Sequence, residues 1–146
     1  MTARAAAKLY TPEVLALATG LSLFPLTDDL PLRAEARSRS CGSVVTIGLS
    51  LDDNGLVSGV GMKISACAIG QASAALMAQA IRGENPACAC WMADALERWL
   101  SGGGDLPPWP GIEALVPARD HPGRRGALLL PWTAACEALS HFAPPR

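Results

Sequence analysis

The sequence is poor in charge, in aromatic side chains and in long apolar runs. Charged residues make up 17% of its 146 positions and aromatic residues 5%, and the formal net charge is −1. Nucleic-acid binding normally needs a basic surface or stacking aromatic side chains, so this composition gives no support for it. A membrane span needs about 20 consecutive apolar residues. The most apolar early run, Val14 to Leu26, is interrupted by Gly20 and Pro25, so we expect no membrane insertion.

Half of the residues are apolar, which is enough to form one core at this length, and we expect one domain over residues 1–146. Arg4 and Lys8 precede the first apolar run as they would in a signal peptide. However, Pro12-Glu13 opens that run, and no small-residue cleavage motif follows it. Five cysteines are an odd number, whereas secreted disulfide frameworks more often have an even one. These observations favour a cytoplasmic protein whose cysteines serve metal or thiol chemistry rather than cross-links.

The clearest local pattern is a β-hairpin over about 44–64. Apolar and polar residues alternate from Val44 to Leu51, Asn54-Gly55 supplies a turn, and Leu56, Val60, Met62 and Ile64 are expected on one face of the returning strand. The polar segment 32–40 is predicted to be an edge strand or an exposed approach segment. Helices are expected over 12–20, 65–83, 86–101 and 128–142, with a short helical turn at 112–116 and loops at 23–31, 102–111 and 121–126. This pattern predicts an α+β fold with a small antiparallel sheet packed against several helices.

Two cysteines flank this hairpin. Cys41 comes shortly before its first strand and Cys67 shortly after its second. Because the two open ends of an antiparallel hairpin meet, we expect both sulfur atoms to lie within reach of one ligand. Cys67 also opens the following helix, where free amides and the helix dipole favour the thiolate, which is the form that binds metals and acts as a nucleophile. The alternative is a pair of partly buried structural thiols.

The order Tyr10-Thr11-Pro12, then Cys41-Gly42, then the stretch Ala66 to Ala74 resembles the IscU/NifU-type iron–sulfur cluster scaffold family, including its SufU-like members. The resemblance implies an α+β fold in which helices pack on one side of a small antiparallel sheet. It also implies a role that is not enzymatic in the strict sense. Such a protein accepts sulfur from a cysteine desulfurase, assembles a [2Fe–2S] cluster and hands it to acceptor proteins, whereas some SufU-like relatives bind zinc and serve as sulfur acceptors.

The ligand set departs from that of the family. Ser43 stands where the family usually has aspartate, and Ala127 stands where it has a third cysteine. Cys41 and Cys67 alone leave two positions open, because a [2Fe–2S] cluster or a zinc ion takes four ligands. Three ways to complete the ligand set stay open: a homodimer that shares a cluster, an outside or partner thiol, or recruitment of His121 as a metal ligand. The fourth alternative is an interaction module that binds no iron or zinc.

The other cysteines and tryptophans have structural interpretations. Cys88 and Cys90 lie two apart on a predicted helix and so point in different directions, and with Cys136 they are expected to fill the core. Trp91 and Trp99 are expected on one helix face, packed against the core or its rim.

His121 and three arginines are expected in one loop near the predicted third-ligand position. His121 has two interpretations, a solvated surface residue and a metal ligand. Arg119, Arg124 and Arg125 form either a solvated loop or a docking patch for an acidic partner.

Overall fold

The computed structural model describes residues 9–39 and 42–140. Its elements in chain order are α2 (Pro12–Gly20), the 3-10 helix η1 (Leu21–Leu23), β1 (Leu32–Arg37), β2 (Val44–Leu51), β3 (Val57–Ser65), α3 (Ala68–Ala80), α4 (Ala87–Leu100), the 3-10 helix η2 (Ile112–Asp120) and α5 (Pro122–Ser140). The strands form one antiparallel sheet in the order β1-β2-β3. The α+β prediction is therefore confirmed. No helix within the described ranges is long and apolar enough to cross a membrane.

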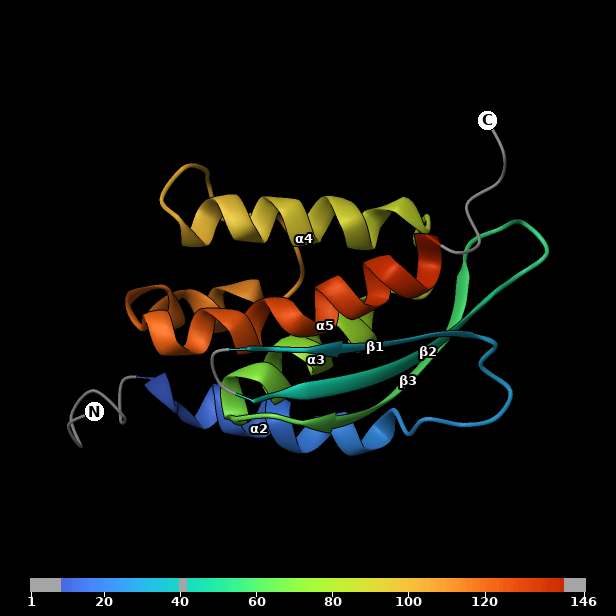
Figure 1. Cartoon of the computed structure of the whole chain (residues 1–146), viewed down its shortest axis with the longest axis horizontal. Coiled ribbons are helices and arrows are strands. Elements are labelled where there is room, and N and C mark those ends of the chain that lie inside the picture. The colour runs from blue at the N-terminus through green and yellow to red at the C-terminus, as the bar shows by residue number, and fades with distance from the viewer. Residues whose placement is uncertain (1–8, 40–41, 141–146) are drawn as a thin grey trace.

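The helices lie in layers on one side of the sheet. Helix α5 packs against β1 and β2 and also against α3, while α2 packs against α3 and α4 packs against α5 (Figure 1). Helix α5 is thus the central element of the fold, because it joins the sheet, α3 and α4.

The predicted hairpin is present with an irregularity near its turn. Ile47 pairs with Met62 across β2 and β3, and the register shifts between Ser50 and Leu51. Because of this shift Val57, with 1% of its surface exposed, takes the buried position that the alternation had assigned to Leu56. The alternation over Val60, Met62 and Ile64 holds, since all three pair across from the inward-facing residues of β2.

Helices α3 and α5 form the core against the inner face of the sheet. The inward side chains of β2 are fully buried. Nine of the 13 residues of α3 are buried, and six of those nine are Gly, Ala or Ser, which lets neighbouring backbones approach closely. The core residues of these three elements include Val45, Ile47, Leu49, Ile69, Ala72, Ala75, Leu76, Leu128 and Trp132.

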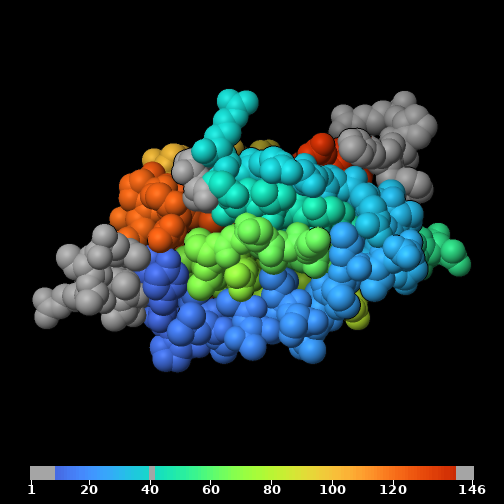
Figure 2. Space-filling model, turned by 60° about the horizontal axis from the view of Figure 1, so that its bottom comes forward, coloured from blue at the N-terminus to red at the C-terminus, as the bar shows by residue number. Residues whose placement is uncertain are grey.

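One end of the outer face of the sheet is covered by the segment that precedes β1. A Cβ atom at Gly61 would lie 2.1 Å from the Pro25 carbonyl oxygen, and one at Gly48 would lie 2.8 Å from the Leu30 Cβ. Side chains at these two positions would therefore push the segment off the sheet. Figure 2 shows β3 (green) between the other strands (cyan) and α2 (blue), with the segment (light blue) beside them.

Three predicted helix boundaries differ from the structure. Helix α3 begins at Ala68 with Cys67 as its N-cap, so Ser65 is the last residue of β3 rather than a cap. Helix α5 begins at Pro122 rather than at residue 128, because the Pro-Gly-rich stretch read as a loop is helical. Proline suits the first turn of a helix, where its missing amide costs nothing. The 3-10 helix η2 runs to Asp120, beyond the short turn that was expected.

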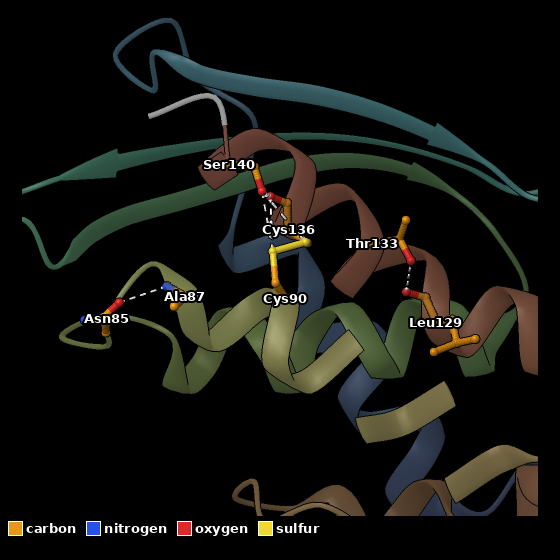
Figure 3. The surroundings of a disulfide bond; sticks show 7 residues. All are labelled: Asn85, Ala87, Cys90, Leu129, Thr133, Cys136 and Ser140. Atoms are coloured by element: carbon orange, nitrogen blue, oxygen red, sulfur yellow. Dashed lines mark hydrogen bonds between the residues drawn. A yellow bond between two sulfur atoms is a disulfide. The ribbon is translucent and has the colours of Figure 1, made fainter. Parts of the chain in front are cut away.

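The expectation that the cysteines are free was wrong for two of them. Cys90 of α4 and Cys136 of α5 form a disulfide, with their Cα atoms 4.5 Å apart (Figure 3). The spacing argument compared Cys90 with Cys88 on its own helix, whereas its partner comes from the neighbouring helix. Cys67 and Cys88 are free and half-buried. Trp91 was expected to pack against the core or its rim, yet 53% of its surface is exposed.

Candidate functional site

The strand register brings the flanks of the two predicted ligands together. Val44 of β2 pairs with Ser65 of β3, so the strand that follows Cys41 and the strand that precedes Cys67 meet at this end of the hairpin. Cys41 itself lies outside the described residues. Among the described residues on either side of it, the Gly42 amide donates to the Ser38 carbonyl at 3.1 Å.

Cys67 is placed by the start of α3. Its side chain is half-buried, and its carbonyl oxygen accepts the amide of Gln71 at 3.0 Å. The Gln71 side chain reaches back to donate to the Ala66 carbonyl at 2.9 Å, which fixes the residue before the cysteine. The first amides of a helix have no partner inside it and form its positive end. The sulfur therefore stands where an anionic ligand or cluster is electrostatically favoured.

Position 127 lies against the first turn of α3. A Cβ atom at Gly70 would be 3.3 Å from the Ala127 Cβ, 3.2 Å from the Ala127 carbonyl oxygen and 2.8 Å from the Ala66 Cβ. Pro131, one turn further along α5, has no amide to donate to the Ala127 carbonyl. Position 127, where the family resemblance predicts a third cysteine, therefore lies against Gly70 in the first turn of α3, and it carries a buried methyl group.

Ser43 is the other substituted position. It lies directly before β2 and is 5% exposed. Its backbone carbonyl accepts the Ser38 amide at 2.9 Å, which ties it to the residue that follows β1. A hydroxyl group does not supply the negative charge of the carboxylate that the family usually has here.

His121 ends η2 and directly precedes α5. Its amide donates to the Ala118 carbonyl at 3.0 Å, and its own carbonyl accepts the Arg124 amide at 2.9 Å. Within residues 9–39 and 42–140, no group of three or more His, Cys, Asp or Glu side chains is close enough to hold a metal ion. Cys67 and His121 are thus not part of a complete metal centre in the described part of the chain.

Two of the three arginines near His121 are engaged inside the protein. The Arg119 guanidinium lies 5.6 Å from the ring centroid of Trp99. Arg125 donates from Nε and Nη2 to the Arg119 carbonyl at 3.1 and 2.9 Å. The first contact joins η2 to α4 and the second joins α5 to η2. Arg124 is therefore the member of the proposed docking patch without such a side-chain contact among those described.

A buried polar contact joins α3 and α5 beside this site. The Ser73 hydroxyl donates to the Leu128 carbonyl at 2.6 Å and accepts from the Trp132 indole Nε1 at 3.0 Å. Ser73 and Trp132 are fully buried, so each polar atom needs its partner. Sequence reasoning missed this contact, although a serine within the alanine-rich stretch of α3 was a signal that could have found it.

Comparison with known proteins identifies the type of chain. No family profile matches it. Over 138 residues it is 26% identical to the iron–sulfur cluster assembly scaffold protein IscU of Thermotoga maritima, across 94% of this chain and 96% of that protein. The crystal structure of the N-terminal part of a NifU-like protein from Brucella abortus matches with a TM-score of 0.82 at 27% identity, covering 95% of this chain and 99% of that one. The chain is of the IscU/NifU/SufU type.

The same fold recurs in a more distant member of the IscU/NifU/SufU type. The SUF-system cluster assembly scaffold protein of Fervidobacterium islandicum AW-1 has a TM-score of 0.81 at 23% identity, covering 91% of this chain and 98% of that one. These relatives are named as scaffolds and not as enzymes. The chain therefore has the fold of the IscU/NifU/SufU type, and the substitutions at Ser43 and Ala127 remain what the sequence resemblance predicts.

Proposed function

We propose that this chain is a scaffold-like protein of iron–sulfur cluster assembly and that it binds iron or a [2Fe–2S] cluster through Cys41 and Cys67. The observation that carries the proposal is similarity to a scaffold protein over 94% of the chain. The position of Cys67 at the positive end of α3 supports it, because a thiolate is both the metal ligand and the acceptor of sulfur.

The ligand count decides how a cluster would be held. A [2Fe–2S] cluster takes four protein ligands, and Ala127 offers none. Two thiolates from each of two chains complete the set, so the proposal expects one cluster for every two chains. Two thiols from a cluster-acceptor protein would complete the set in the same way at the moment of transfer.

Anaerobic reconstitution with ferrous iron and sulfide tests this proposal. We expect visible absorption, two iron atoms for two chains, and a shift to the mass of a dimer on size-exclusion chromatography. Cys41→Ala and Cys67→Ala should each abolish the absorption, because each removes half of the chain's thiolate ligands. Cys88→Ala is the matched control, since Cys88 is also a free, half-buried cysteine. A colourless product, or colour retained in both ligand variants, would contradict the proposal.

The buried methyl group of Ala127 favours a second candidate function, which is sulfur acceptance from a cysteine desulfurase. This step needs one thiol instead of four ligands. The thiolate of Cys67 attacks the outer sulfur of the desulfurase persulfide, forms a new S–S bond and releases the desulfurase cysteine as a thiolate. Intact-protein mass spectrometry after incubation with desulfurase and cysteine should then show the gain of one sulfur atom, lost in Cys67→Ala. Cluster formation without this gain in mass would contradict sulfur acceptance and support the scaffold function.

A further inference from the structure

A cavity of about 260 Å³ opens beside α4, on a part of the surface that the proposed function does not use. Its walls include Glu84 just before α4, Cys88, Trp91 and Met92 of α4, and Trp109 with Pro110 in the segment before η2. These residues come from three separate parts of the chain, and most are apolar or aromatic. A cavity with this kind of lining and one charged group is typical of a binding site.

The two indole rings of the cavity differ in mobility and exposure. Trp109 is fixed, because its Nε1 donates to the Leu76 carbonyl at 2.7 Å and its ring meets that of Trp132 edge-to-face at 4.8 Å. Trp91 has 53% of its surface exposed, and no contact of its indole nitrogen is recorded within the described residues. The cavity thus has one rigid aromatic wall and one aromatic side chain open to solvent.

One wall of the cavity carries a negative charge. Glu84 is the charged residue of its lining; it is exposed, and its carboxylate makes no ion pair among the described residues. Burial and the negative charge of Glu84 raise the pKa of the Cys88 thiol, which lines the same cavity, to about 11. A negative charge that disfavours a thiolate favours a cation at the same place.

We propose that this cavity receives an arginine side chain presented by a partner protein. A guanidinium group is planar, stacks on indole rings and pairs with a carboxylate, so it matches both the aromatic walls and Glu84. Lysine fits less well, because its ammonium group is more strongly hydrated and does not stack. The residues that contribute most to binding at protein interfaces are enriched in tryptophan, tyrosine and arginine.

Two-dimensional NMR of the indole N–H groups tests the proposal, with N-acetyl-arginine amide as the probe and N-acetyl-citrulline amide as its neutral isostere. We expect arginine to shift the Trp91 and Trp109 signals and to bind about tenfold more tightly than citrulline, as a cation–π contact and a partly exposed ion pair together allow. Trp132 and Trp99 serve as internal references, since Trp132 is buried on Ser73 and Trp99 is covered by Arg119.

Two variants test whether the preference for arginine comes from the Glu84 carboxylate or from the overall charge of the protein. Glu84→Gln should remove the preference for arginine over citrulline, whereas Glu97→Gln, an exposed acid on α4 outside the cavity, should keep it. Trp91→Leu should weaken arginine binding about fivefold through loss of the cation–π contact, and Trp91 is exposed enough for the fold to tolerate the change.

Three results would overturn the proposal. These are equal binding of arginine and citrulline, an unchanged preference in Glu84→Gln, and shifts confined to Trp99 or Trp132. Titration of the wild-type protein with salt gives a readout that needs no variant. Arginine binding should weaken with ionic strength and citrulline binding should not, and salt-independent arginine binding would also contradict the proposal.

Discussion

The middle and the C-terminal end of α5 are attached to the rest of the molecule by different chemistry. In the middle of the helix, Leu128 and Trp132 are joined to α3 through the hydroxyl of Ser73, inside the core. Near its C-terminal end, Cys136 is joined to α4 by a disulfide to Cys90, with the exposed Ser140 beside both sulfur atoms (Figure 3). The middle of α5 is thus held by hydrogen bonds and packing, and its C-terminal end by a covalent bond.

Helix α5 therefore has one contact that responds to reductants and one that does not. The contact with Ser73 depends on complementary packing and is indifferent to reductants. The contact between Cys90 and Cys136 depends on the redox potential of the surroundings. Reduction should therefore loosen the attachment of α4 and leave the residues around Cys67 and Ala127 in place.

The largest expected effect comes from removing the disulfide. A bond that closes a loop with a sequence separation of 46 restricts the unfolded chain and should contribute about 4 kcal/mol to the free energy of unfolding. The double variant Cys90→Ala/Cys136→Ala should lose this amount in urea denaturation, and dithiothreitol should have no further effect on it. Cys88→Ala is the control, which should respond to the reductant as wild type does. Equal stability of oxidised and reduced wild-type protein would contradict the expectation.

The next effect concerns the buried contact in the middle of α5. Ser73→Ala leaves the Trp132 indole nitrogen without its acceptor in the core, which should lower the free energy of unfolding by about 2 kcal/mol. Ser140→Ala removes a hydroxyl that also donates to a carbonyl of α5, at 2.6 Å, but from an exposed position. We expect that change to cost less than about 0.5 kcal/mol. Similar losses for the two variants, measured by urea denaturation, would show that burial does not distinguish the two contacts.

The smallest expected effect is a gain at position 127. Ala127→Cys places a thiol beside Ala66 and Gly70, where the family has its third ligand. We expect about tenfold tighter binding of ferrous iron or zinc, corresponding to about 1.4 kcal/mol, as measured by competition with a chelator. Ala127→Ser, of similar size but without a thiolate, is the control. Equal affinities for the two variants would mean that this position cannot reach a metal bound at Cys67.

Local patterns predicted much of the fold. Thr11 and Pro12 marked the start of α2, where the Thr11 hydroxyl accepts the Val14 amide at 3.1 Å. The alternation over β2 predicted its inward face, because Val45, Ile47 and Leu49 are buried, whereas the other face is half-buried except at Gly48. The start of α5 was missed, since Pro122 and Gly123 look like a loop unless the bonds of Arg125 to η2 are known.

The candidate site could be predicted only in part. The position of Cys67 at the hairpin end followed from sequence order, because strand pairing fixes which residues meet. The neighbourhood of Ala127 and the pairing of Cys90 with Cys136 depend on how α3, α4 and α5 cross. No spacing within one element encodes such crossings. The cavity beside α4 was missed for the same reason, as its walls come from separate segments.

The disulfide also determines what happens when the backbone is cut. The exposed segment from Ser101 to Asp105 contains three consecutive glycines and lies inside the loop that Cys90 and Cys136 close. Proteases prefer exposed segments of this kind. A single cut there would leave both fragments tethered through sulfur, so the nicked protein would migrate as one species in non-reducing electrophoresis and separate into two bands once a reductant is added.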